Sequence, residues 1–176
     1  AAEGMKFHRF FTVCPQCVPS RAGYMTGRSA VAARNTRFSS PLARDEIAFP
    51  ELLRSGAGYY TGAAGRTYHL DGPGSGSYPQ IAYVIDKYGL KTFTDRLDFV
   101  DTSSPGSYVA RVTQFLDQKP AGKPFFLWMN FSDPHHPWNA NSDEPDPATV
   151  KVPGHLPDTP GMRQQIAAYC GEVNRL

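Results

Sequence analysis

The sequence has no long apolar run, little net charge and few cysteines. None of its apolar stretches approaches the roughly 20 residues that a transmembrane helix requires. The net charge of +2 at pH 7 is too small to indicate binding to nucleic acid or to an anionic membrane surface. Three cysteines are an odd number, so they cannot all pair with one another.

The composition is that of a folded domain with long ordered loops. The chain has 176 residues, of which 40% are hydrophobic and 19% charged, enough for one domain with a proper core. The 16 glycines and 16 prolines exceed average usage but stay below the range typical of disorder. Residues 1–7 lack the apolar core of a signal peptide and resemble the end of a helix that Gly4 stops, with no helix before it. At the other end, a helical pattern runs to Leu176 without a cap. We therefore expect residues 1–176 to be one domain cut at both ends.

Apolar patterns predict alternating helices and strands. Strands or extended segments are expected at 7–13, 59–64, 99–100 and 124–131. The last of these is apolar nearly throughout, which is typical of a central parallel strand buried on both faces. Helices are expected from Ser20, around 47–56, from Ser104 to Lys119 and from Thr159 onward, with a loop at 71–80. This alternation is typical of a layered α/β domain.

The most unusual stretch is CVPSRAGYMTGR, from Cys17 to Arg28. Pro19 suits the first turn of a helix, where its missing N–H needs no partner. The free N–H groups and positive dipole end of that helix would lie near Cys17, where an anion is favoured. Arg21 and Arg28 add positive charge, and the planar guanidinium suits oxyanions. The stretch predicts a cysteine at the floor of an anion site.

Cys14 and Cys17 also form a C-x-x-C pair. Such a pair can be a thiol redox centre or half of a zinc site, although no second pair of ligands completes the site here. The simpler interpretation is that Cys14 is a small, partly buried neighbour of the site. Cys170 falls within a helical pattern and is expected to be a packing residue.

Polar side chains follow two of the predicted strands. Arg66 and His69 follow one, and His135 and His136 follow the other. Ligand sites of α/β sheets lie beyond the carboxyl ends of strands. Arg66 and His69 could both face an anion, or be a solvated arginine and a hydrogen-bonded loop histidine. Adjacent histidines rarely point the same way, so His135 and His136 are a weak metal-binding pair.

Together these residues resemble the sulfatase family, whose signature is Cys-x-Pro-Ser-Arg followed shortly by Thr-Gly-Arg. The signature matches at 17, 19, 20, 21 and 26–28, and Met25 stands where the family usually has leucine. The resemblance implies an alkaline-phosphatase-like α/β fold, with a central, mostly parallel sheet and helices on both faces. It also implies that a maturation enzyme oxidises Cys17 to formylglycine, whose hydrated aldehyde is the nucleophile for sulfate ester hydrolysis.

The resemblance further implies roles for individual residues. Arg21 would stabilise charge and His69 would act as a base, both beside the nucleophile from Cys17. Arg66, which replaces the family's lysine, and His135, which matches Pro-His-x-Pro, would bind the sulfate group. His69 follows Arg66 with two residues between them, where many members have one.

The family uses a divalent cation, commonly calcium, and formylglycine 17 would be one of its ligands. The other ligands belong to upstream and downstream segments that have no match here, and Asp71 and Asp133 match no family position. We therefore expect this partial catalytic domain by itself to bind calcium weakly and to be inactive. Family habit implies a sulfated small molecule or carbohydrate as substrate and a periplasmic, extracellular or lysosomal location.

Two alternatives stay open at this point. A formylglycine hydrolase of the same superfamily could act on phosphonate monoesters or phosphodiesters, which resemble sulfate esters in shape. A non-catalytic module could instead use Cys14 and Cys17 for redox chemistry or metal binding.

Overall fold

The computed structural model describes residues 3–38, 40–66, 79–101, 107–139 and 143–176. Ser104, Pro105, His69 and Asp71 lie outside these ranges. The chain divides into two compact units, Ala1–Asn130 and Phe131–Leu176. No helix within the described ranges is both long and apolar enough to cross a membrane.

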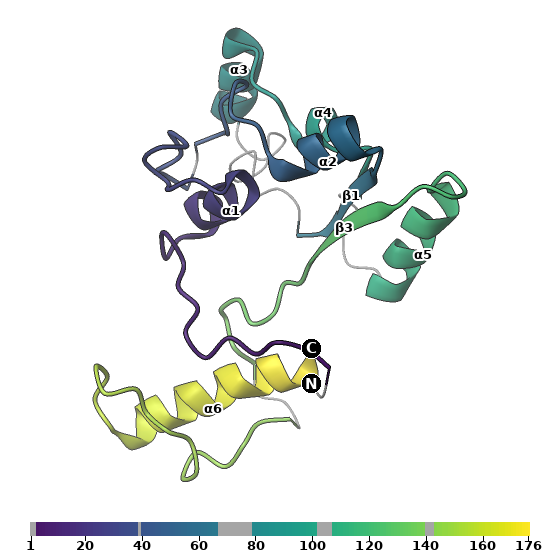
Figure 1. Cartoon of the computed structure of the whole chain (residues 1–176). Helices are drawn as coiled ribbons and strands as arrows, with labels where there is room; N and C mark the ends of the chain where they lie inside the picture. Colours follow the sequence, from purple (N-terminus) through teal and green to yellow (C-terminus); the bar gives the residue numbers. More distant parts are fainter. Residues whose placement is uncertain (1–2, 39, 67–78, 102–106, 140–142) are drawn as a thin grey trace. The chain divides into compact units, whose positions relative to one another are not determined.

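The first unit contains a parallel sheet of three strands. Its order is β2 (Phe99–Val100), β1 (Tyr60–Gly65) and β3 (Phe125–Asn130), with β1 in the middle. β1 pairs in parallel with both neighbours, and it runs along the whole length of β3 (Figure 1). All three strands were predicted, and the parallel α/β class is confirmed.

Helices connect and flank these strands. In the first unit they are α1 (Cys17–Thr26), α2 (Phe49–Ala57), α3 (Pro79–Tyr88), α4 (Phe93–Arg96) and α5 (Tyr108–Gln118). The second unit contains α6 (Pro160–Arg175), whose first turn is capped by the Thr159 hydroxyl accepting the Met162 N–H at 3.2 Å. α2 ends before Gly58, whose φ of +70° is a left-handed conformation that favours glycine.

The structure corrects three predictions from the sequence and contains a helix, α3, that the sequence did not predict. Residues 7–13, expected as a strand or extended segment, form no strand: their side chains are exposed, and no described strand pairs with them. Helix α3 was not predicted because its apolar run, residues 81–85, is continuous and shows no helical period. Helix α1 begins at Cys17, three residues early. β3 is only half-buried, because within the described residues it has a strand on one side only.

The core lies on both faces of the sheet. Successive side chains of a strand point to opposite faces. One face packs against α1 and α2 in a cluster that includes Ala22, Met25, Ala48, Ala63 and Leu97, with Phe49 and Trp128 against it. The other face packs against α5, through Ala64, Phe99 and Phe115 with Tyr60, Leu127 and Met129. The expectation of helices on both faces is thereby confirmed for this sheet.

Phe115 is the centre of the α5 face. It is fully buried, and its ring lies 5.1 Å from that of Tyr60, 5.5 Å from Phe99 and 5.7 Å from Phe125, measured between centroids. Gly62 of β1 makes room for it, because a Cβ on Gly62 would lie 2.5 Å from the Phe115 ring. The missing side chain at residue 62 therefore lets α5 approach the middle of the sheet.

We expect Phe115→Ala to lower the free energy of unfolding by about 3–5 kcal/mol, the usual cost of emptying a buried phenylalanine site. Denaturant unfolding measures this. The matched control on the same helix is Val109→Ala, because Val109 is 74% exposed and should change stability by less than about 0.5 kcal/mol. Equal losses in the two variants would contradict this packing.

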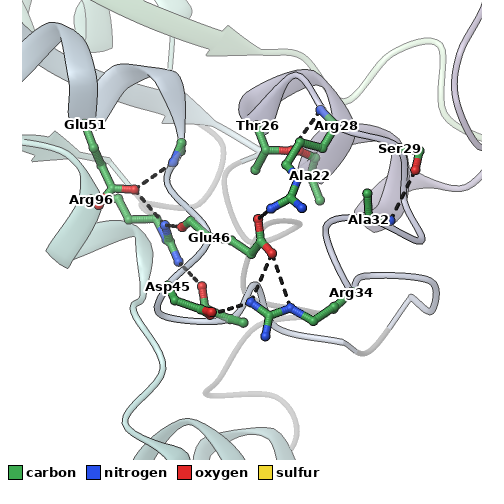
Figure 2. A network of polar contacts seen from close by, with 12 residues as sticks. Ala22, Thr26, Arg28, Ser29, Ala32, Arg34, Asp45, Glu46, Glu51 and Arg96 are labelled. Carbon is green, nitrogen blue, oxygen red and sulfur yellow. Dashed lines mark hydrogen bonds and ion pairs between the residues drawn. The ribbon is translucent and has the colours of Figure 1, made fainter.

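A buried polar network joins α2 to α4 on the other side of the unit. Arg96 of α4 is 1% exposed and donates to Glu51 Oε2 at 2.7 Å, to the Glu46 carbonyl at 2.7 Å and to the Ala43 carbonyl at 3.0 Å (Figure 2). Glu51 also accepts from Lys91 Nζ at 2.7 Å and from the Ala48 N–H at 2.9 Å, which caps the start of α2. Burial opposes ionisation, but these donors outweigh it and hold the pKa of Glu51 below its usual 4.5.

The depressed pKa of Glu51 makes stability depend on pH. Above the usual value of 4.5 the ionised carboxyl favours the folded state, and this contribution is lost as the pH falls through the lower folded-state pKa. At pH 7 we expect Glu51→Gln to cost about 3 kcal/mol, because Arg96 stays buried without a countercharge. Urea unfolding at pH 7 and pH 3 should show a smaller gap in stability between wild type and variant at pH 3 than at pH 7.

A gap of the same size at both values would show that the charge of Glu51 is not what stabilises the fold. Asp45→Asn is the control, because Asp45 accepts from Arg34 in the same network (Figure 2) but is exposed. We expect it to leave stability nearly unchanged.

Candidate functional site

Cys17 is the first residue of α1. Gln16 precedes it in an extended conformation, with φ −141° and ψ 139°, and contributes no side-chain cap. Pro19 lies in the first turn, where its ring costs no intrahelical hydrogen bond. The half-buried thiol of Cys17 therefore stands at the positive end of the helix dipole, where negative charge is stabilised.

Five residues line an open pocket of about 340 Å³ at this end of α1. They are Cys17, Ser20, Arg21, Tyr24 and Trp128. Cys17, Arg21 and Tyr24 come from one face of the helix, since residues four and three apart lie above one another. Trp128 comes from β3, and the Arg21 guanidinium lies over its indole ring, 5.3 Å from the centroid. The structure thus brings a thiol and a guanidinium together in one pocket.

The strand ends meet this helix at Asn130, the last residue of β3. Arg21 Nη1 donates to the Asn130 side-chain oxygen. The Arg66 N–H, directly after β1, donates to the Asn130 carbonyl at 3.0 Å. Arg66 and Arg21, both predicted as site residues, are therefore connected through a residue that the sequence did not single out. The available signal was a polar residue closing an otherwise apolar strand.

Gly65 makes this junction possible. Its φ of +82° lies in the left-handed region, and a Cβ there would lie 2.0 Å from the Asn130 carbonyl oxygen. No other residue type fits without moving the end of β3.

We expect Gly65→Ala to destabilise the protein by more than Gly58→Ala. Both glycines have positive φ, so each alanine incurs a conformational cost of about 1–2 kcal/mol. Only Gly65 adds a backbone clash, because a Cβ at Gly58 meets open space. Thermal unfolding of the two variants compares them, and equal shifts in melting temperature would show that Gly65 and Asn130 do not approach so closely.

Arg28, the last residue of the signature, was expected to add positive charge to the pocket. In the structure it does not, because its charge is paired elsewhere. Its guanidinium forms an ion pair with Glu46 Oε2 at 2.5 Å, and Glu46 is 3% exposed (Figure 2). Glu46 also pairs with Arg34 at 3.0 Å. Arg28 lies beyond the end of α1, about three helical turns from Cys17, where a buried carboxylate neutralises it.

Thr12 links the backbone before α1 to Ser20, which lines the pocket. Its hydroxyl donates to the Cys14 carbonyl at 3.0 Å and hydrogen bonds with the Ser20 hydroxyl at 2.6 Å. Cys14 and Cys17 are both free thiols, as is the half-buried Cys170 of α6. The redox interpretation of the C-x-x-C pair stays a prediction.

The described residues do not fit a calcium site by themselves. Calcium in proteins takes six to eight oxygen ligands, mainly carboxylates and carbonyls. Across the described ranges, no group of three or more histidine, cysteine, aspartate or glutamate side chains is arranged to hold a metal ion.

His135 and His136 lie in the second unit, in an exposed segment that follows β3. His135 Nδ1 hydrogen bonds with the His136 carbonyl at 2.6 Å, and the His136 ring packs edge-on against Trp138. The role of His135 toward Cys17 stays a prediction, as does that of His69.

Two polar contacts and one ring contact hold this segment against α6. Arg175 donates to Asp133 at 2.6 Å, and the Asn139 N–H donates to Glu172 at 3.1 Å. The Trp138 ring packs against that of Tyr169, with centroids 5.6 Å apart. The backbone that carries His135 is therefore fixed to a helix.

Comparison with known proteins finds sequences that are similar to this chain. It is 28% identical over 169 residues to the uncharacterized sulfatase YidJ of Escherichia coli K12, covering 78% of this chain and 33% of that protein. It is 34% identical over 101 residues to bovine arylsulfatase A, covering 53% and 18%. It is 26% identical over 147 residues to an N-acetylglucosamine-6-O-sulfatase of Bacteroides thetaiotaomicron, covering 78% and 25%.

The matched region thus spans a third or less of the length of these relatives. No solved structure shows a significant match. The family model described as Sulfatase matches residues 1–175, nearly the whole sequence, and the chain belongs to the sulfatase family.

Proposed function

We propose that the full-length protein hydrolyses sulfate esters with a nucleophile made from Cys17. The observation that supports this most is the pocket at the start of α1, where Cys17 and Arg21 lie side by side on one helix face. The match to the sulfatase family supports the choice of sulfate over other anions. A maturation enzyme would convert Cys17 to formylglycine before the protein is active.

The chemistry of the modified residue proceeds in two displacements. One hydroxyl oxygen of hydrated formylglycine attacks sulfur, an O–S bond forms, and the ester S–O bond breaks as the alcohol leaves with a proton. The second hydroxyl then loses its proton to His69, the bond from carbon to the sulfate oxygen breaks, and sulfate leaves as the aldehyde reforms.

The side chains of this chain stabilise charge on the transferred group. Arg21 is held in place over Trp128 and by Asn130, so its guanidinium needs no reorganisation during the reaction. Arg66 and His135 are proposed to bind the remaining sulfate oxygens. Arginine at position 66 binds an oxyanion through two N–H groups but does not give up a proton, so the leaving alcohol takes its proton elsewhere.

The match to the sulfatase family is the basis for proposing calcium as a cofactor. Formylglycine 17 would supply one ligand, and the other oxygen ligands would come from outside the described residues. We propose a sulfated small molecule or sulfated carbohydrate as substrate, and an exported location for the full-length protein.

The test is Cys17→Ala in the full-length protein, produced together with a maturation enzyme. We expect turnover of an aryl sulfate to fall by at least ~10³-fold, the scale on which losing a covalent nucleophile acts. Mass spectrometry of the wild-type peptide should show residue 17 about 18 Da lighter than cysteine, because formylglycine replaces SH₂ by oxygen. Near wild-type turnover in the variant would refute the nucleophile.

Cys14→Ala is the matched control. The proposal predicts that it keeps activity, because Cys14 does not line the pocket. If both cysteines were needed and residue 17 stayed unmodified in the matured protein, the redox or metal-binding interpretation would replace this one. Parallel assays with a phosphonate monoester decide the substrate class, and we expect the larger kcat/KM for the sulfate ester.

A further inference from the structure

We propose that Asn130 is a positioning residue that anchors the Arg21 guanidinium over the pocket and couples it to the start of the Arg66 segment. This inference rests on the proposed function for its kinetic consequences, but its structural part does not. Asn130 is 4% exposed, so its side chain is held in one place by the surrounding fold.

The Asn130 side chain and main chain serve different partners. The side-chain oxygen accepts from Arg21 Nη1, which comes from α1. The main-chain carbonyl accepts the Arg66 N–H at 3.0 Å, which comes from the end of β1. The side-chain NH₂ donates to the Trp128 carbonyl at 3.4 Å, which fixes the orientation of the amide. One buried residue therefore contacts two segments: one carries Arg21, predicted to stabilise charge, and the other carries Arg66, predicted to bind sulfate.

The chemistry of the anchor suits an anion site. An amide oxygen accepts a hydrogen bond from a guanidinium without bringing a negative charge, whereas a carboxylate would bring one. Arg28 of the same signature shows the contrast, because it pairs with the buried carboxylate of Glu46. An asparagine at position 130 orients Arg21 without itself adding a negative charge that would repel sulfate.

The Trp128 ring also restrains the Arg21 guanidinium. The guanidinium lies over the indole face at 5.3 Å, and such cation–π contacts restrict its tilt. Because Cys17 lies one turn before Arg21 on the same helix face, fixing Arg21 also fixes its direction relative to the nucleophile. Losing Asn130 should therefore change the geometry of catalysis rather than the fold.

The direct test is the mobility of the Arg21 guanidinium, measured by NMR relaxation of arginine side-chain nitrogens in the full-length protein, with Arg21→Lys used to assign the signal. We expect Asn130→Leu, which has similar size but no acceptor, to make the guanidinium mobile. Asn130→Asp keeps an acceptor and should keep it ordered. Equal order of Arg21 in wild type and Asn130→Leu would overturn the proposal.

The kinetic test is a double-mutant cycle with an aryl sulfate. We expect Asn130→Leu to lower kcat by about 10- to 100-fold, since small misplacements of a catalytic group have effects of this size. In an Arg21→Ala background the same change should alter kcat less than about twofold, because the two residues act as a unit. Additive losses would refute the coupling.

The Asn130→Asp variant separates position from charge. Its carboxylate should keep Arg21 ordered but raise KM for the sulfate ester, because it offsets the positive charge that attracts the substrate. An unchanged KM would refute the charge part of the proposal. If the wild-type protein hydrolysed no sulfate ester, the proposed function would fail, and the mobility of Arg21 would still decide whether Asn130 anchors it.

Discussion

The structure of the first unit depends on the parallel pairing of β1 with β3, which continues from Tyr60 to Gly65 without interruption. Parallel strands end at the same edge of a sheet, so this pairing brings Arg66 and Asn130 together although 63 residues separate them in the sequence. Gly65 permits the final approach, because a side chain at that position would overlap the Asn130 carbonyl. The candidate site is built on that shared edge.

The two arginines of the signature have different physical roles. Arg21 lies in the pocket, bonded to a neutral amide and placed over an aromatic ring. Arg28 lies beyond the end of α1 and pairs with Glu46, whose backbone carbonyl also accepts from Arg96. One arginine therefore faces the anion site, and the other joins α1 to the buried network around α2 and α4 (Figure 2). The signature was expected to bind an anion as one unit. In the structure only its first arginine lines the pocket, and its last one stabilises the fold around α1.

Local signals predicted much of the fold. β1 and β3 were predicted from their apolar runs, α2 from its apolar pattern, and α6 from its spacing and from Thr159. Segments without a distinctive local signal were missed or mistaken. The apolar run of α3 fits a helix or a strand equally well. The apolar and aromatic residues at 7–13 have the composition of a strand, but no described strand pairs with them.

The sequence by itself determined the family, the candidate nucleophile and the parallel α/β class, because each of these is written in a short motif or an apolar run. Only the tertiary structure decided which charges act together: that Arg21 meets Asn130, and that Arg28 and Glu46 neutralise one another. Such pairings join residues far apart in the chain, and they depend on strand register and on a glycine's missing side chain. These pairings cannot be predicted from any local pattern in the sequence.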